Sequence, residues 1–123
     1  LIPHTLNECS NDNTFHCSAG IQYRDFLFVD DLIKAIFKCF NNNKSIGEVI
    51  NIGTGKPRNV KKVILFIKNK INLGKPVFGK ISLRRDEIFI LYPKISKAKK
   101  ILNWKPYTSF QKGIETVIRY YKS

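Results

Sequence analysis

The sequence predicts a single domain in which strands and helices alternate. Of the 123 residues, 43% are hydrophobic and 12% are aromatic. This is enough to build a core and too apolar for a disordered basic tail. The order strand, turn and helix occurs twice along the chain, as is typical of α/β and α+β domains. We therefore expect an α/β or α+β fold, in which the order of the strands stays open.

The first of these units occupies residues 26–40. A short apolar run at 26–29 precedes apolar side chains at the spacing of an amphipathic helix, namely Leu32, Ala35, Ile36, Cys39 and Phe40. Asp30 or Asp31 is the expected N-cap, because a short carboxylate side chain accepts hydrogen bonds from the free amides of a first helical turn. The Asn-rich stretch at 41–45 then predicts a polar loop.

The second unit begins with a predicted strand at residues 48–52. The strand ends in a Gly-Thr-Gly turn at 53–55, and Pro57 prevents its simple continuation. Asn59 is the expected N-cap of the following helix, which closes near Gly74. The apolar stripe of this helix consists of Val60, Val63, Ile64, Ile67 and Ile71.

The last part of the chain predicts extended segments followed by two helices. Residues 76–83 and 88–92 are the candidates for extended structure. Ser96 and Ser109 are the expected N-caps of the two helices. The apolar side chains that should face inward are Ala98, Ile101 and Leu102 in the first helix, and Phe110, Ile114, Val117, Ile118 and Tyr121 in the second.

The net charge of +13 lies entirely in the second half of the chain. Residues 1–60 carry six basic and six acidic side chains, whereas residues 61–123 carry 16 and three. A basic half of this kind attracts phosphates, polyanions or anionic lipid head groups. Solvated surface lysines account for the same composition, so the charge alone selects no function.

The sequence also bears on location and completeness. It has no apolar stretch near the ~20 residues of a membrane span, and its first residues lack a signal-peptide pattern. The three cysteines (Cys9, Cys17 and Cys39) lack the spacing of a disulfide framework, which favours reduced thiols in a cytoplasmic protein. Because the sequence contains no Met, we expect a fragment or a processed piece of a larger protein.

Most familiar site patterns are weak here. The turn at 53–56 has glycines that would let its amides approach a phosphate, but it lacks the other residues of the dinucleotide and Walker motifs, so a plain tight turn is favoured. The candidate zinc ligands are His4, Cys9, His16 and Cys17. They lack the close pairs of ligands that are typical of structural zinc sites. No Gly-x-Ser-x-Gly elbow is present. We therefore predict neither a metal site nor a Ser-His-Asp site.

Two charged groups are better candidates for a binding site. Arg24 and Asp25 precede the apolar run, and an Arg-Arg-Asp-Glu sequence occupies residues 84–87. A guanidinium offers a planar fork of donors that suits a phosphate or diphosphate, so arginines from these two places could clamp such a group. Two local arginine–carboxylate pairs on the surface are an equally good interpretation.

Five segments follow one another in a recognisable order. They are residues 20–31, similar to G-x-x-x-R-D-F-x-x-V-D-D; residues 51–55, similar to N-x-G-x-G; Arg84 with Glu87, similar to R-x-x-D/E; residues 96–106, similar to S-K-A-x-x-x-L-G-W-x-P; and residues 109–114, similar to S-F-E-E-G-L. Together they resemble the extended short-chain dehydrogenase/reductase family. This family comprises NAD(P)-dependent nucleotide-sugar epimerases, dehydratases and reductases. One departure is Asn103, which replaces the family's glycine before Trp104 and tolerates the left-handed conformation of a helix end.

The resemblance implies a fold and a site. The fold would be α/β: the C-terminal strands of a Rossmann-like doubly wound sheet plus a small α+β substrate-binding lobe, so that residues 1–123 form a partial domain. Arg24 and Arg84 would bind the diphosphate of a nucleotide-diphosphate sugar, and Glu87 would lie near its ribose or base. The parent enzyme would serve the synthesis of polysaccharide or O-antigen sugars.

Two parts of the family's pattern are missing from the chain. The glycine-rich cofactor loop is absent, and no tyrosine is followed four residues later by a lysine, as the family's catalytic Tyr-x-x-x-Lys requires. We therefore expect no catalytic residue in this chain. NAD or NADP would serve the parent enzyme through a missing N-terminal Rossmann half, and this fragment alone would bind neither. Such enzymes are commonly homodimers, but the oligomeric state stays open.

Two other interpretations remain at this point. A small basic nucleic-acid-binding module would use the charge together with base-stacking rings, drawn from Phe66, Phe78, Phe89, Tyr92 and Trp104. That module requires exposed rings, so burial of Phe66 and Trp104 would count against it. The other interpretation is a truncated fragment that is inactive because its sheet edge and apolar face have lost their partner. We expect neither nucleic acid nor a membrane as a partner.

Overall fold

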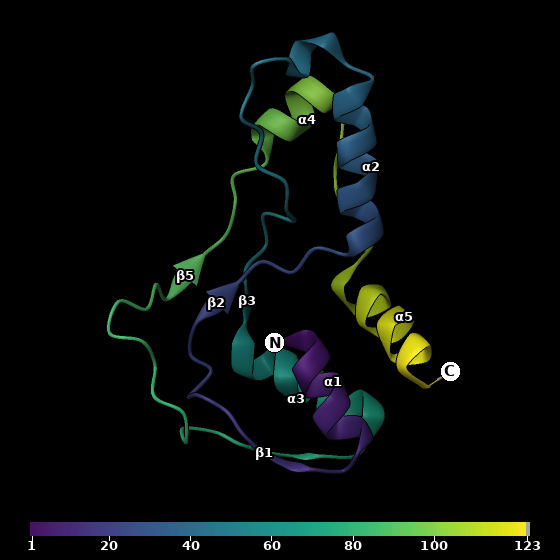
Figure 1. Cartoon of the computed structure of the whole chain (residues 1–123). Helices are drawn as coiled ribbons and strands as arrows, with labels where there is room; N and C mark the ends of the chain where they lie inside the picture. The colour runs from purple at the N-terminus through teal and green to yellow at the C-terminus, as the bar shows by residue number, and fades with distance from the viewer. Residues whose placement is uncertain (123) are drawn as a thin grey trace.

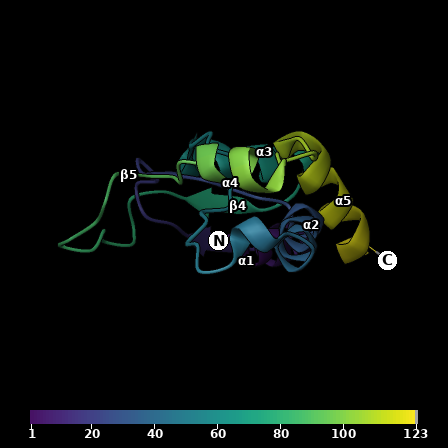
Figure 2. The same ribbon diagram turned by 90° about the horizontal axis from the view of Figure 1, so that it is seen from above.

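The computed structural model describes residues 1–122. Its helices gather in two groups joined by short strands (Figure 1). Helices α1, α3 and α5 pack together in one group, and α2 packs against α4 in the other. Seen from above, the loop that leads into β5 projects away from both groups (Figure 2). The described part of the chain contains no helix that is both long and apolar enough to cross a membrane.

The first helix, α1 (Ile2–Ser10), was not expected from the sequence. A proline stands at its start, where the missing N–H costs nothing because no intrahelical acceptor is available there. Its buried side chains, Thr5, Leu6 and Cys9, lie at helical spacing and face the other helices of its group. This stripe was the available signal for the helix, but it spans barely two turns.

Helix α2 (Val29–Phe40) is the predicted amphipathic helix, but its predicted cap is wrong. The N-cap is Phe28, whose carbonyl accepts the N–H of Asp31, and no side chain caps the helix. Asp30 and Asp31 lie inside the first turn instead. The apolar run before the helix is not a strand, and the predicted polar loop after it contains the 3₁₀ turn η1 (Asn43–Ser45).

Helix α3 (Val60–Ile71) confirms the second predicted helix and its cap. The Asn59 side-chain oxygen accepts the N–H of Lys62 at 3.1 Å. The helix ends at Asn72, whose φ of 63° is left-handed. The predicted apolar stripe is buried in full: Val60, Val63, Ile64, Ile67 and Ile71.

The two C-terminal helices are α4 (Ser96–Leu102) and α5 (Phe110–Lys122). Ser96 is the first residue of α4 rather than its N-cap, which is Ile95, so this predicted cap is wrong. Ser109 does cap α5, because its Oγ accepts the N–H of Lys112 at 3.3 Å. Helix α4 ends at Asn103 with a φ of 48°, as expected for the residue that replaces glycine there.

The strands are short and pair across long stretches of sequence. Strand β2 (Tyr23–Arg24) lies antiparallel to β3 (Arg58–Asn59) and parallel to β5 (Ile90–Leu91), which gives the order β3-β2-β5. A second pair joins β1 (Thr14–His16) to β4 (Lys75–Val77) in parallel. The extended segments predicted at 76–83 and 88–92 are therefore confirmed only in part.

The strand predicted at 48–52 is not formed. Within residues 1–122 no strand pairs with this segment, and Val49 is 82% exposed. A strand is defined by hydrogen bonds to a neighbour, so an apolar pattern without a neighbour stays an extended, unpaired stretch.

Each helix group has its own hydrophobic core. The larger core unites α1, α3 and α5 with Phe15 and Cys17, and the smaller one joins Ala35 of α2 to Ala98, Leu102 and Trp104. Helix α2 also leaves an apolar face uncovered within the described chain. That face consists of Val29, Leu32, Ile33, Ile36, Phe37 and Phe40, which are 39–80% exposed.

Candidate functional site

Strands β2 and β5 bring together the two charged groups singled out in the sequence. The guanidinium Nη2 of Arg24 forms an ion pair with Oε1 of Glu87, across 63 residues of sequence. Its Nη1 donates to the carbonyl oxygen of Tyr23 at 2.8 Å. The two side chains of the pair are only 27% and 15% exposed. The charges thus form one long-range pair rather than two local pairs on the surface.

Arg84 lies apart from this pair. Its carbonyl oxygen accepts the N–H of Glu87 at 3.2 Å, which closes a turn on the projecting loop. Its side chain is exposed and makes no hydrogen bond or ion pair within residues 1–122. The structure therefore joins Arg24 to Glu87 and leaves the guanidinium of Arg84 available.

The Gly-Thr-Gly turn at 53–55 contacts an anion, and that anion belongs to the chain itself. The N–H of Thr54 donates to both carboxylate oxygens of Asp25, at 2.9 and 3.0 Å, and the N–H of Gly55 donates to Oδ2 at 2.7 Å. Gly55 has a φ of 70°, so the successive amides form the concave arrangement that binds anions. The sequence favoured a plain tight turn, and the amide contacts to Asp25 were missed.

Gly53 allows a close approach of three segments. A Cβ atom at this position would lie 2.2 Å from Cγ of Pro93 and 3.3 Å from Oδ2 of Asp25. Since the contact to Pro93 is far below van der Waals distance, no larger residue fits without displacing it. The turn is thus packed between the end of β2 and the end of β5.

A cleft of about 540 Å³ opens where these segments meet. Its lining includes Arg24 and Asp25, at the end of β2, and Tyr92 and Pro93, which follow β5. Asn51 adds an amide group to the lining. Of these residues, the sequence identified Arg24 as a ligand. It singled out Tyr92 only as a candidate base-stacking ring and Asn51 only as part of a family motif, because nothing local in the sequence places them beside Arg24.

Asp31 is a buried polar residue with a role that the sequence did not indicate. It is fully buried, and its Oδ2 accepts the N–H groups of Tyr107 and Thr108 at 3.0 and 2.7 Å. Its Oδ1 accepts the hydroxyl of Thr108 at 3.2 Å, and its carbonyl oxygen accepts Nε1–H of Trp104 at 3.0 Å. Asp31 therefore fastens residues 104–108 to α2.

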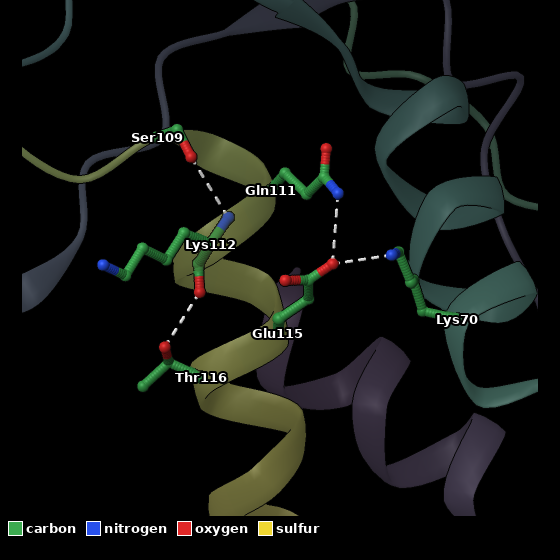
Figure 3. Close-up of polar contacts among 6 residues, drawn as sticks. All are labelled: Lys70, Ser109, Gln111, Lys112, Glu115 and Thr116. Atoms are coloured by element: carbon green, nitrogen blue, oxygen red, sulfur yellow. Dashed lines mark hydrogen bonds and ion pairs between the residues drawn. The ribbon is translucent and has the colours of Figure 1, made fainter.

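A polar cluster on the surface ties α3 to α5 (Figure 3). Lys70 Nζ lies 2.6 Å from Oε1 of Glu115, and Gln111 donates to the same oxygen at 3.2 Å. These two hydrogen bonds, that of Lys70 first, lower the pKa of the Glu115 carboxyl. Because the carboxylate is open to solvent, water screens the pair, and it contributes little to stability.

Two of the rings considered for base stacking are covered. Trp104 is 1% exposed, and Phe66 is partly buried with its ring 5.6 Å from that of Phe110. Basic side chains also lie on helices α2 to α5 rather than on one of them. A stacking platform that includes Trp104 is therefore not available.

The candidate zinc ligands do not assemble either. Within residues 1–122, no three or more His, Cys, Asp or Glu side chains gather in a way that could hold a metal ion. Cys9 and Cys17 are buried free thiols of the larger core. Burial raises the pKa of both thiols, and for Cys9 the nearby Cys17 adds to the effect.

These raised pKa values lead to a prediction about thiol reactivity. The thiolate is the reacting form, so Cys9 and Cys17 should react with a disulfide reagent only on unfolding, whereas the partly buried Cys39 reacts first. The unfolded chain ionises these thiols at a lower pH, so stability falls as the pH rises above the ordinary thiol pKa. Labelling followed by peptide mass spectrometry checks the order, and early labelling of Cys9 would contradict it.

The chain is similar to known proteins along most of its length. The family model of GDP-mannose 4,6 dehydratase matches residues 2–117. CDP-abequose synthase from Salmonella typhimurium is 30% identical over 126 residues, covering 97% of this chain and 42% of the relative. A putative UDP-glucose 4-epimerase from Methanocaldococcus jannaschii is 35% identical over 105 residues, covering 85% of this chain and 32% of the relative.

A solved structure supports the same relationship. An epimerase from Methanothermobacter thermautotrophicus superposes with a TM-score of 0.88 at 27% identity, covering 98% of this chain and 36% of that one. This confirms the predicted α/β, Rossmann-like fold class. The chain spans less than half the length of each of these relatives. It belongs to the GDP-mannose 4,6 dehydratase family, within the extended short-chain dehydrogenase/reductases.

Proposed function

We propose that this chain is the substrate-binding C-terminal portion of an NAD(P)-dependent nucleotide-sugar epimerase, dehydratase or reductase. The observation that carries the proposal is the partly buried Arg24–Glu87 pair, whose Arg24 lines the cleft between the ends of β2 and β5. The names of the relatives, which specify CDP- and UDP-linked sugars, support the ligand class. The similarity to an abequose synthase supports a role in O-antigen or polysaccharide sugar synthesis.

In this proposal Arg24 binds the diphosphate. A guanidinium has five N–H donors, and the contacts to Tyr23 and Glu87 use two of them. The other donors are free for phosphate oxygens, while Glu87 keeps the guanidinium oriented and accepts a hydrogen bond from a ribose or base. Arg84 supplies a second cation from the neighbouring loop.

The catalytic groups and the dinucleotide belong, in this proposal, to an N-terminal half. The apolar face of α2 and the unpaired segment at 48–52 support such a partner. A sheet in the N-terminal half would cover that face of the helix and would pair with the segment. NAD or NADP would bind that half. On this proposal the described chain supplies substrate binding and no catalytic residue.

Calorimetric titration of the chain with CDP, UDP, dTDP and GDP, and separately with NAD and NADP, tests the proposal. We expect one nucleotide diphosphate to bind with a millimolar or lower Kd that rises with salt, and neither cofactor to bind. No heat with any nucleotide, in a chain that unfolds cooperatively, would contradict the proposal. Binding to single-stranded nucleic acid instead would favour the nucleic-acid module, and a chain that neither binds nor unfolds cooperatively would be an inactive fragment.

Replacing Arg84 with alanine in the full-length protein tests the second cation. The Kd for the nucleotide sugar should rise by about tenfold, because one charge-assisted contact to phosphate is lost. The Kd for NAD or NADP should not change. Arg85→Ala is the matched control, since it removes an adjacent arginine from the same loop. An Arg84→Ala protein with unchanged substrate affinity would remove Arg84 from the site.

A further inference from the structure

We infer that Asp25 is a positioning residue for nucleotide-sugar binding, because its carboxylate locks the 53–55 turn that fixes the ends of β2 and β5 around Arg24. The inference rests on the proposed function and adds a role for a residue that contacts the chain itself. Asp25 directly follows Arg24 in the sequence and lines the same cleft. Its carboxylate accepts hydrogen bonds from Thr54 and Gly55, which lie 29 and 30 residues later in the sequence.

The anion site formed by the 53–55 turn is already occupied. Amides arranged as in the 53–55 turn bind phosphate or carboxylate oxygens. Here both amides are already used by Asp25, at distances of 2.7–3.0 Å. These two amides are therefore not available to a substrate phosphate, and they instead anchor the chain as it leaves β2.

The turn also contacts Pro93 through Gly53. Gly53 packs so closely on Pro93 that a Cβ atom there would lie 2.2 Å from the proline ring. Pro93 follows β5, whose Leu91 is paired with Arg24. The turn thus touches both chain ends that leave the β2–β5 pair, one through Asp25 and the other through Pro93.

The same contacts hold the backbone beside Arg24. A guanidinium binds a diphosphate well only when its backbone and rotamer are held in the binding geometry before the ligand arrives. Glu87 holds the guanidinium from one side, through an ion pair. Asp25 holds the backbone one residue further along. Loss of the Asp25 carboxylate leaves the amides of Thr54 and Gly55 unpaired and frees the chain immediately after Arg24.

The experiment compares Asp25→Ala, Asp25→Asn and the control Asp30→Asn in the full-length protein, by titration with the nucleotide diphosphate that the unchanged protein binds. Asp30 is an exposed carboxylate five residues away on α2. We expect Asp25→Ala to raise the Kd by about tenfold or more. The isosteric Asp25→Asn keeps one acceptor oxygen for the turn, so it should bind several-fold more weakly than the unchanged protein and better than Asp25→Ala.

Chemical rescue separates positioning from general damage. Formate fits the space of the deleted carboxyl group, so adding it to Asp25→Ala should lower the Kd towards that of the unchanged protein. The Kd of the unchanged protein at the same formate concentration shows how strongly formate competes with the nucleotide diphosphate for Arg24. The Kd for NAD should be the same in all variants. If Asp25→Ala does not fold, Asp25→Asn decides the question, because it preserves the shape of the side chain.

The outcomes are distinguishable from failure of the proposed function. If the unchanged protein binds no nucleotide diphosphate, the proposed function is overturned and the positioning role with it. If the unchanged protein binds the nucleotide diphosphate and both folded Asp25 variants bind it as tightly as the unchanged protein does, only the positioning role is overturned. Weaker binding that formate does not restore in Asp25→Ala would also overturn it.

Discussion

Replacing Arg24 with alanine should weaken nucleotide-diphosphate binding by about 100-fold, or about 2.7 kcal/mol. The variant removes the guanidinium that the proposal places on the diphosphate. It also leaves Glu87, only 15% exposed, without its partner and with a negative charge beside the phosphates. Titration of the full-length protein with the nucleotide diphosphate measures the effect. The Kd for NAD or NADP should stay the same.

Two further variants sharpen the test of Arg24. Arg58→Ala is the matched control, because Arg58 lies directly across from Arg24 in the β2–β3 pair. Its guanidinium stacks on the Phe110 ring, whereas that of Arg24 forms an ion pair with a carboxylate. It should bind the nucleotide as the unchanged protein does. Arg24→Lys keeps the charge and loses the planar fork, so it should recover part of the affinity. If the losses in Arg24→Ala and Arg58→Ala were equal, bulk charge rather than the Arg24–Glu87 site would explain binding.

The helices of this protein were largely predictable because their signals are local. The Asn59 and Ser109 caps lie within three residues of the amides they accept, and the stripe of α3 repeats within its own twelve residues. The failures among the strands have the opposite character. Strands β2 and β5 are two residues long and pair across more than 60 positions, so no alternation of side chains marks them. The predicted strand at 48–52 has the right pattern but no neighbour in the described chain.

In the candidate site, too, individual residues were predictable from the sequence and their contacts were not. Arg24 and the 84–87 group were singled out from their charges, the family motifs then assigned roles to Arg24, Arg84 and Glu87, and the structure joins only Arg24 to Glu87. Asp25 and the 53–55 turn were both noticed, but as separate features, because a carboxylate and two amides 30 residues apart carry no mark of their contact. Side-chain chemistry was thus readable from the sequence, whereas the pairing of groups required the fold.

Asp31 illustrates the same limit and leads to the largest expected effect on stability. An aspartate at the start of a helix is normally interpreted as a cap, yet this one is fully buried and binds residues 107 and 108. Asp31→Ala should lower the free energy of unfolding by about 3–5 kcal/mol, because it removes a fully buried carboxylate, leaves two partly buried amides and a hydroxyl without their acceptor, and removes packed volume. Thermal and urea unfolding of the full-length protein, followed by circular dichroism, measure the loss.

The controls for Asp31 separate the hydrogen bonds from the charge. Asp31→Asn can keep its amide oxygen on Tyr107 and Thr108 and turn its NH₂ group towards the Thr108 hydroxyl, so it should cost only about 1 kcal/mol. Asp30→Ala removes an exposed carboxylate from the same helical turn and should cost less than about 1 kcal/mol. In Asp31→Ala, hydrogen exchange at the amides of Tyr107 and Thr108 should accelerate ahead of exchange in α3, because the two helix groups have separate cores. Equal losses in Asp31→Ala and Asp30→Ala would mean that the buried carboxylate does not fasten the 104–108 segment to α2.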